Sequence, residues 1–431
     1  MLESKKRNRW VFILVIFFFL FFHQFDVVIL GPLTTEIMAT YNMGDASVNP
    51  IVTVGLIFGI VFYLVWGYFF DRHSRKKLLS IAGFLWGVTS WLMGIAPTYA
   101  TYLISNAAGG VDNASYSGIY ALVGDYFRTK NRGKILGLLH LTQPLAYFFG
   151  TILVLLVGEF VNWRLVLLVT GSFGFIMALI IFIFIREPKR GASEPALADI
   201  EMTGIYLFDW EIARDVLKKP SMLLIYAFGF FGVMPWFVFV DWMPTYLAEV
   251  NAVSITWVNV NLLPPLIALT LGYPIGGFFG DIFFRLRKNG RIFIGLLGAF
   301  FPAAFLYFAV QAPNIQDQRF SMLIVGMAFF MAFTWPNIIA SILDITLPEF
   351  RSTAIAIVLL TQAIGALVGP WIVALYQDQL GLGNAILFVC LGAWGISLIL
   401  QIGLLVFVPK ELELLRRHMA YRSHLEARLE K

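Results

Sequence analysis

The chain has 431 residues, of which 59% are apolar, 16% aromatic and 13% charged, and its formal net charge is +5. Soluble domains carry roughly 25% charged residues, so this composition excludes an ordinary soluble protein and indicates a membrane protein. A basic balance can reflect a nucleic-acid partner, but the placement of the basic residues favours membrane topology, and we expect no nucleic acid. Cys390 is the single cysteine, so no intramolecular disulfide can form.

Twelve apolar segments are long enough to span a bilayer, which takes about 20 residues. The first is too long for a signal peptide and lacks a small-residue cleavage site. In chain order the predicted spans are 10–30, 50–70, 78–96, 100–124, 135–158, 164–185, 221–247, 257–284, 291–310, 320–343, 353–376 and 385–408.

The basic residues predict the orientation of these spans. All but two of the 31 Lys and Arg residues fall on one side of the predicted membrane, the exceptions being Arg164 and Arg319. Because Lys and Arg mark the cytoplasmic side, we expect both termini in the cytoplasm and the protein in a bacterial or archaeal plasma membrane. The expected parts are a cytoplasmic N-terminus (1–9), a six-helix bundle (10–185), a cytoplasmic linker (186–220) with a short helix near 209–218, a second six-helix bundle (221–408) and an amphipathic helix on the membrane surface (409–431).

The two bundles repeat each other in sequence. Leu-Thr-Gln at 141–143 matches Leu-Thr-Gln at 360–362. Further matches, in the same order in both halves, pair Asp26 with Asp241, Gly67 with Gly277, Asp71 with Asp281, Asp125 with Asp344, Arg132 with Arg351 and Gly150 with Gly369. Two parallel six-helix repeats with a site between them are a transporter architecture. The sequence therefore predicts an all-α membrane protein of twelve transmembrane helices in two pseudo-symmetric bundles.

A loop motif identifies a family. GYFFDRHSRKK at 67–77 resembles the loop signature of the major facilitator superfamily, with Ser74 where the family usually has Gly, and GGFFGDIFFRLRKNGR at 276–291 is its degenerate second copy. The segments 113–127 and 344–356 are similar to Spinster-type transporters of lysophospholipids and sphingosine phosphate. DWMPTYLAEV at 241–250 is equally similar to the organic-anion symporter branch. Against the Spinster pattern, Val27 replaces an Arg and Asn113 replaces a Glu.

The resemblance implies that charges at the cytoplasmic helix ends hold that side of the molecule closed. Ion pairs and helix termini that face each other across the two halves can form a breakable latch, whereas the alternative is that the basic residues only set topology. The expected gate residues are Gly67, Asp71, Arg72, Arg75, Asp125, Arg132, Asp281, Asp344 and Arg351.

Polar residues of the predicted spans concentrate in spans one, four, seven and ten, which line the central cavity in the family. Spans three, six, nine and twelve have no charged residue in their cores, and in the family they pack outside. The expected cavity residues are His23, Gln24, Asp26, Asp112, Asn113, Tyr116, Tyr120, Gln143, Asp241, Trp242, Asn337 and Gln362. The two glutamines could instead hydrogen-bond between helices, the aromatic residues could face lipid, and His140 is expected at the membrane interface.

Asp26 lies within the first predicted span, where a carboxylate costs roughly 2.5–3.5 kcal/mol on insertion scales. A low-dielectric site favours the neutral carboxyl group, so Asp26 could load and release a proton, with His23 as a partner. The alternative is a structural Asp26 whose hydrogen bonds come from His23 or Asn113.

These features predict a proton-coupled secondary transporter working by alternating access. The predicted spans have no Lys or Arg in their cores, which favours a cationic, zwitterionic or neutral amphipathic substrate, such as a lysophospholipid-type molecule, over an organic anion. An organic-anion symporter or a non-transporting receptor of the same fold are the alternatives. The sequence offers no cluster of metal ligands, nucleophile elbow or nucleotide loop, so we expect no enzyme activity, metal or cofactor. The expected partners are the substrate, protons and membrane lipids, and we expect a monomer.

Overall fold

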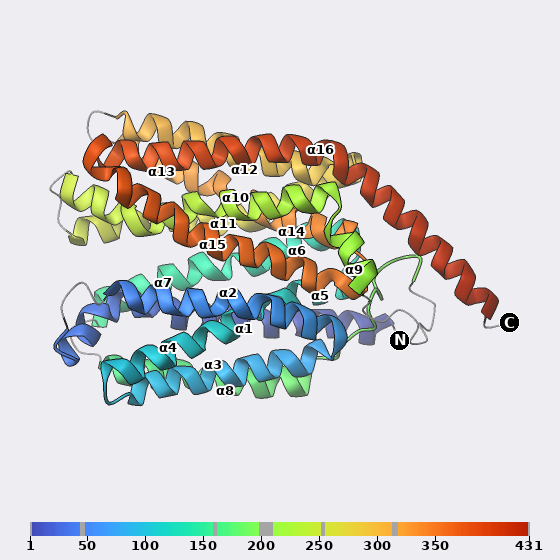
Figure 1. Ribbon diagram of the computed structural model, residues 1–431, viewed down its shortest axis with the longest axis horizontal. Helices are drawn as coiled ribbons and strands as arrows, with labels where there is room; N and C mark the ends of the chain where they lie inside the picture. The colour runs from blue at the N-terminus through green and yellow to red at the C-terminus, as the bar shows by residue number, and fades with distance from the viewer. Residues whose placement is uncertain are drawn as a thin grey trace.

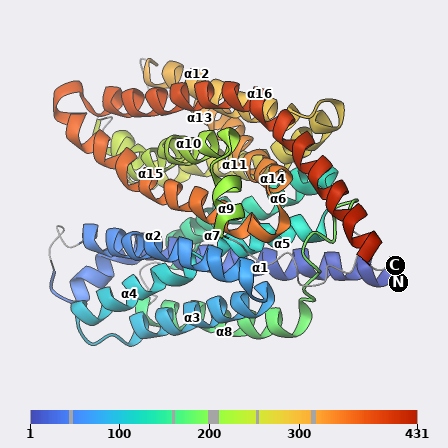
Figure 2. The same ribbon diagram turned by 45° about the vertical axis from the view of Figure 1, so that its right-hand side comes forward.

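The computed structural model describes residues 2–43, 48–157, 162–197, 210–250, 255–312 and 318–429, and every regular element in these ranges is a helix. Helices suit a membrane because they satisfy their own backbone hydrogen bonds where no water is present. The helices form two bundles, drawn one above the other in Figure 1. Both termini lie at the same end of the molecule in both ribbon views (Figures 1 and 2), and we call it the terminal end.

The first bundle, the N-half, runs from α1 to α8. Its elements are α1 (Leu2–Thr40), α2 (Val48–Arg72), α3 (Arg75–Ile95), α4 (Tyr99–Asn113), α5 (Tyr116–Tyr126), the 3-10 turn η2 (Thr129–Asn131), α6 (Arg132–His140), α7 (Thr142–Val157) and α8 (Trp163–Phe184).

The second bundle, the C-half, follows the short helix α9 (Trp210–Leu217), which corresponds to the helix predicted in the linker. Its elements are α10 (Pro220–Thr245), the π-helical turn η3 (Tyr246–Val250), α11 (Ile255–Leu286), α12 (Gly290–Val310), α13 (Gln318–Met331), α14 (Thr334–Ile345), the 3-10 turn η4 (Pro348–Phe350), α15 (Arg351–Leu380) and α16 (Leu382–Leu429).

Each of the twelve predicted spans corresponds to a helical segment. Nine helices among the described residues are long and apolar enough to cross a membrane. The predicted span 50–70 is α2, whereas 100–124 is divided into α4 and α5 and 135–158 into α6 and α7. The prediction of an all-helical fold with two six-span halves is confirmed.

The fourth and tenth spans are both interrupted, the fourth between α4 and α5 and the tenth between α13 and α14. The sequence analysis treated each of these spans as one uninterrupted helix. After each break, the second part contacts the opposite half: α5 contacts α15, and α14 contacts α6. The interruptions therefore place corresponding segments of the two repeats at the interface between the halves.

The halves meet along two further pairs of helices, α2 with α15 and α6 with α11. Small residues allow this close approach. A Cβ atom at Gly67 would lie 2.6 Å from Cβ of Ala356 and 3.1 Å from Cα of Thr353. Gly67 thus lies where α2 packs on α15.

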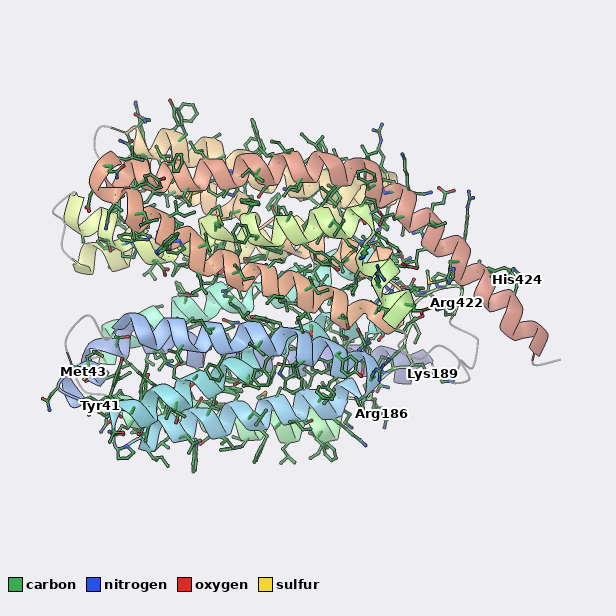
Figure 3. The ribbon with its side chains drawn as sticks, viewed as in Figure 1. Tyr41, Met43, Arg186, Lys189, Arg422 and His424 are labelled. Carbon is green, nitrogen blue, oxygen red and sulfur yellow. The ribbon has the colours of Figure 1, made fainter. Side chains whose placement is uncertain are left out.

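The last helix, α16, continues beyond the bundle into the tail that was predicted to be amphipathic. Its Leu412, Leu415 and Met419 are buried, and the last two pack in a cluster with residues of α9 and the linker. Arg422 forms an ion pair of 2.5 Å with Glu349; Figure 3 labels Arg422 and His424 on this helix at the terminal end. The sequence analysis placed this apolar face on the membrane, whereas in the structure it contacts protein.

Candidate functional site

A cavity of about 210 Å³ lies between the two halves. Tyr116 and Tyr120 of α5 line it from the N-half, and Trp236 of α10 and Trp335 of α14 line it from the C-half. Among the described residues, the wall of the cavity contains no Asp, Glu, Lys or Arg. The cavity is therefore an aromatic chamber whose described wall has no carboxylate, ammonium or guanidinium group.

Five of the predicted cavity residues line this chamber: Gln24, Tyr116, Tyr120, Gln143 and Gln362. The two glutamines come from corresponding positions of the repeat, so the structure brings the two repeat positions to one chamber. Their amides supply donors and acceptors without charge.

Other predicted cavity residues lie elsewhere. Asn113 donates to the carbonyl of Gly109 in its own helix at 3.3 Å, and Trp242 donates to the carbonyl of Pro370 at 3.1 Å. Asn337 is fully buried and donates to the carbonyl of Gly276 at 3.0 Å, which ties α14 to α11. Asp241 is exposed near the end of α10.

Two expectations about the wall of the cavity were wrong. Spans nine and twelve were expected to pack outside, yet Ala299 of α12 and Trp394 and Ser397 of α16 line the chamber. His140 was expected at the membrane interface, but it lines the chamber too, and its Nδ1 lies 3.2 Å from the hydroxyl of Tyr120. A single polar residue at the end of a short helix gave no sequence signal for this position.

Asp26 of α1 lies outside the cavity wall, where α1 packs against α3 and α8. It is 4% exposed. Its carboxylate accepts hydrogen bonds from Trp86 Nε1 at 2.8 Å, from Ser90 Oγ at 2.6 Å and from the hydroxyl of Thr170. The sequence analysis considered His23 and Asn113 as its structural partners. The structure instead supplies three donors from other helices, so the polar atoms of this buried carboxylate are satisfied.

His23, one turn before Asp26, forms a second buried cluster. Its Nε2 lies 2.6 Å from Oδ2 of Asp112, and its Nδ1 lies 2.7 Å from the hydroxyl of Tyr116. Gln24 also donates to that hydroxyl, at 2.7 Å. Because Tyr116 and Gln24 line the cavity, these contacts connect the chamber to the His23–Asp112 pair.

At the terminal end, two carboxylates cap helices of the opposite half. Asp71 at the end of α2 accepts hydrogen bonds from the backbone N–H groups of Ser352 at 3.0 Å and Thr353 at 2.7 Å, at the start of α15. Asp281 of α11 accepts from the backbone N–H groups of Gly133 and Lys134 at 2.9 Å each, at the start of α6. The first N–H groups of a helix lack partners within it and carry partial positive charge, so a carboxylate stabilises them.

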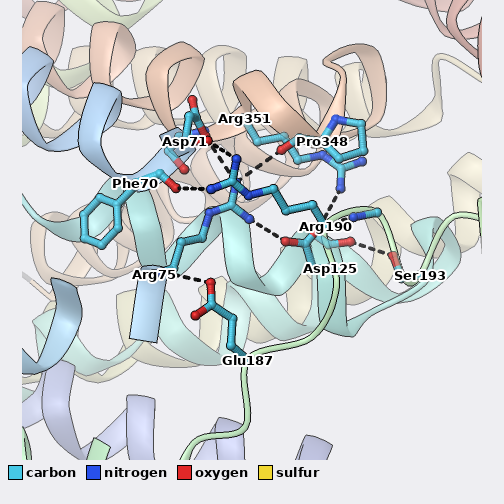
Figure 4. A network of polar contacts seen from close by, with 12 residues as sticks. Phe70, Asp71, Arg75, Asp125, Glu187, Arg190, Ser193, Pro348 and Arg351 are labelled. Carbon is cyan, nitrogen blue, oxygen red and sulfur yellow. Dashed lines mark hydrogen bonds and ion pairs between the residues drawn. The ribbon is translucent and has the colours of Figure 1, made fainter. Parts of the chain in front are cut away.

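Buried ion pairs extend these caps into two chains of alternating charge. The first runs Asp71, Arg75, Asp125, Arg351, and the second runs Asp281, Arg291, Asp344, Arg132. Each chain uses both halves and is the repeat-related counterpart of the other. Figure 4 shows Arg75 and Arg351 directed at Asp125 in the first chain. These eight residues, together with Glu194, are called the latch below.

Glu194, from the linker, joins the two chains. Its Oε1 lies 2.5 Å from Arg132 and also pairs with Arg351. Burial would raise the pKa of Glu194, but the two guanidinium groups outweigh it and lower the pKa to about 2. The carboxylate is therefore charged at any physiological pH.

Seven of the nine predicted gate residues form ion pairs in the latch: Asp71, Arg75, Asp125, Arg132, Asp281, Asp344 and Arg351. Gly67 packs on Ala356 beside them. Arg72 is exposed, and its guanidinium lies 4.5 Å from the ring centre of Tyr68 on the same helix. Two latch residues were not among the predicted gate residues: Arg291, which ends the second copy of the loop motif, and Glu194, which lies in the linker outside the repeat.

The comparisons with known proteins agree with this geometry. The model of the "Major Facilitator Superfamily" matches residues 16–370. Protein spinster of Drosophila melanogaster is 25% identical over 395 residues, and the match covers 88% of this chain and 64% of that protein. The "Sphingosine-1-phosphate transporter SPNS2" of Danio rerio is 24% identical over 369 residues, covering 80% of this chain and 71% of that protein.

A solved structure with the same fold is a bacterial homologue of the human lysosomal transporter Spinster, described as inward-facing and unoccupied. It has a TM-score of 0.58 and 17% identity, and the match covers 96% of this chain and 98% of that one. The match to the family model extends over most of the chain and reaches from the first half into the second. The chain is a member of the major facilitator superfamily, a transporter related to the Spinster proteins.

Proposed function

We propose that the protein is a proton-coupled secondary transporter that moves an amphipathic, lipid-like or cationic molecule by alternating access. The observation that carries this proposal is the combination of a chamber between the halves with a latch that joins the halves at one end. A site between two repeats that rock against each other is the arrangement that alternating access requires.

The latch faces the cytoplasm in this proposal, in the plasma membrane of a bacterium or archaeon. The support is the distribution of Lys and Arg, nearly all of which lie in segments on one side of the spans. Figure 3 labels Arg186, Lys189 and Arg422 at the terminal end, whereas Tyr41 and Met43 lie at the opposite end. With the latch formed, the structure corresponds to a state closed toward the cytoplasm.

The chamber supports a substrate with an apolar body and a cationic, zwitterionic or neutral head. Aromatic faces attract cations and bury apolar surface, whereas an anion would require a cationic partner or a helix N-terminus. The name of the zebrafish relative gives sphingosine 1-phosphate as its cargo, which is also amphipathic. We therefore place lysophospholipid-type molecules first among the candidate substrates.

The His23–Asp112 pair is the proposed proton site, because its hydrogen bond to Tyr116 connects a buried carboxylate and imidazole to the chamber. In the proposed resting state Asp112 is ionised and accepts from Nε2–H of neutral His23, which leaves Nδ1 as an acceptor for the Tyr116 hydroxyl, and Gln24 donates to the oxygen of that hydroxyl. Both nitrogen atoms of the imidazole are then satisfied.

Protonation of His23 changes these hydrogen bonds. Both nitrogen atoms of the imidazolium are donors, so the Tyr116 oxygen must accept from Nδ1–H and its own hydroxyl proton must turn away, toward the chamber. Proton uptake thereby changes the Tyr116 hydroxyl from a group occupied by His23 into a donor available to substrate. This rearrangement is the proposed link between proton binding and substrate binding.

The test uses the purified protein in liposomes with an imposed pH gradient. Lumenal pH and labelled substrate are followed together for lysophosphatidylcholine, sphingosine 1-phosphate and a lipophilic quaternary ammonium. We expect one of them to move with protons, and Asp112→Asn to abolish the proton movement. Asp26→Asn and His23→Gln are measured alongside, and Glu413→Gln, an exposed carboxylate of the tail, is the matched control.

Transport that is indifferent to the pH gradient in the wild type would contradict proton coupling. Coupling that is lost in Asp26→Asn but retained in Asp112→Asn would move the proton site to the cluster of Trp86, Ser90 and Thr170. Binding of all three probes without movement of any would favour a receptor of the same fold.

A further inference from the structure

The linker segment after α8 packs against the N-half through four successive contacts. Glu187 accepts hydrogen bonds from the backbone N–H of Arg75 at 2.8 Å, at the start of α3. Arg190 donates to the carbonyls of Phe70 at 3.2 Å and His73 at 3.1 Å, at the end of α2 and just beyond it. Figure 4 shows Glu187 and Arg190 on either side of Arg75.

The next residues continue this contact toward the latch. The backbone N–H of Gly191 donates to Asp125 at 2.8 Å, and Gly191 has a φ of 71°, a conformation that favours glycine. The hydroxyl of Ser193 donates to the carbonyl of Gly124 at 2.5 Å. Segment 187–193 is therefore fixed to the N-half on the way to Glu194.

Glu194 lies between two arginine side chains that correspond to each other in the repeat. Arg132 of the N-half and Arg351 of the C-half occupy corresponding positions of the repeat, and both contact the same oxygen atom of Glu194. Both arginine side chains are fully buried. Two buried guanidinium groups this close repel each other unless an anion lies between them.

We propose that Glu194 is a gate residue of the transport cycle, a linker carboxylate that stabilises the closed terminal end by lying between Arg132 and Arg351 and pairing with both, in addition to their pairs with Asp344 and Asp125. Because segment 187–193 is fixed to the N-half, opening separates Glu194 from Arg351 and leaves it with Arg132. The linker is thereby a working part of the gate as well as a connection between the halves. This inference rests on the proposed alternating access.

The test measures closure directly and needs no substrate. In a Cys390→Ser background, cysteines replace Lys130 and Arg285, two exposed residues from opposite halves; the Arg285 guanidinium donates to the Lys130 carbonyl at 3.2 Å. Disulfide yield and the distance between spin labels at these positions report whether the terminal end is closed. The variants are Glu194→Gln, Asp71→Asn as the positive control, and Glu413→Gln as the matched exposed carboxylate.

We expect Glu194→Gln to reduce the ratio of closed to open molecules by roughly five- to thirtyfold and to shift the label distances to larger values. Glu413→Gln should behave like the parent. If Glu194→Gln is not recovered as a folded protein, Glu194→Asp carries the test, and an intermediate loss of closure is expected, because the shorter side chain reaches the two arginines less well.

Two results separate this inference from the proposed function. If Asp71→Asn opens the terminal end while Glu194→Gln or Glu194→Asp leaves it closed, the linker is no part of the gate and the inference is overturned. If neither Asp71→Asn nor Glu194→Gln changes the distance, the latch itself does not control closure, and the proposed alternating access at this end fails with it.

Discussion

Asp281 accepts a hydrogen bond of 2.9 Å from the backbone N–H of Gly133, so a carboxylate of the C-half caps a helix of the N-half. The same relationship occurs in reverse between Asp71 and Thr353, at 2.7 Å. The two contacts are related by the internal repeat, and each is buried. The terminal end is therefore closed by two equivalent contacts, in which each half supplies a carboxylate that caps a helix of the other half.

This equivalence predicts equal effects for Asp71→Asn and Asp281→Asn. Each substitution removes a charged acceptor from two backbone N–H groups, and hydrogen bonds to charged groups contribute about 1.5–3 kcal/mol each. We expect each variant alone to shift the molecule toward the open state by a similar amount, and the double variant to shift it further. Label distances between residues 130 and 285 measure this, and a large effect of one variant with none of the other would contradict the equivalence.

A larger side chain at Gly67 should also oppose closure. A Cβ atom at this position already lies 2.6 Å from Cβ of Ala356, so Gly67→Val must push α2 away from α15. We expect transport to be lost and the terminal end to remain open, with thermal stability changed less than transport. The control for the added side chain is Gly392→Val in α16, where no atom lies within 4 Å of the Cβ position. If this control also fails to transport, the loss in Gly67→Val reflects folding and not closure.

Tyr116→Phe should uncouple transport from the pH gradient. The substitution keeps the ring in the wall of the chamber but removes the hydroxyl that connects it to His23. We expect substrate binding to weaken by about tenfold or less, which corresponds to the loss of roughly one hydrogen bond, while acceleration by the pH gradient disappears. Flux into liposomes with and without the gradient measures this. Tyr226→Phe, which removes a hydroxyl outside the cavity wall, should leave the acceleration intact.

The donors around Asp26 should matter for stability. Ser90→Ala and Thr170→Val each remove one of its three hydrogen bonds and leave part of a buried carboxylate unsatisfied. We expect each substitution to cost about 1–3 kcal/mol of unfolding free energy, seen as a lower midpoint of thermal unfolding in detergent. Ser80→Ala removes a hydroxyl that donates to the carbonyl of Lys76 in its own helix at 3.2 Å and should cost less. Unfolding midpoints that are equal in the three variants would assign no structural role to the Asp26 cluster.

The contribution of Glu194 to closure should not depend on pH in the physiological range. Arg132 and Arg351 lower its pKa from the usual 4.5 to about 2, so its stabilising effect is complete above about pH 4.5 and is lost as the pH falls toward 2. Label distances measured between pH 5 and 8 in the Asp112→Asn background should therefore be constant. A transition near neutral pH in that background would show that closure depends on a titrating group other than Asp112.

The sequence was sufficient for the fold because its signals are strong and local. Spans of about 20 apolar residues and a nearly complete separation of basic residues define the topology, and the repeat gives the two bundles. The repeat also predicted most of the latch, since Asp125, Asp344, Arg132 and Arg351 come from matched positions. Arg291 was missed because its spacing from Asp281 differs from that of Arg75 from Asp71, so alignment of the loop motif did not pair it with Arg75.

The site was predicted less well, because which face of a helix meets the cavity depends on tertiary packing. Asp26 and His23 lie one turn apart on α1, yet Asp26 is enclosed by α3 and α8 while His23 connects to the chamber. The chamber also reaches α12 and α16, whose lining residues Ala299, Trp394 and Ser397 are uncharged and so gave no charged signal in the sequence. Glu194 lies outside the repeat, where the comparison of the halves has no information.

The position of Glu194 has a consequence for how such a molecule can be built. Duplication of a six-helix unit leaves two copies of each residue. It therefore produces pairs of corresponding residues and no single residue that both copies share. Where two duplicated arginines converge, their common counter-ion has to come from the one stretch of chain that was not copied. The linker between two duplicated halves is thus a segment that can supply an asymmetric residue to a structure that is otherwise pseudo-two-fold symmetric.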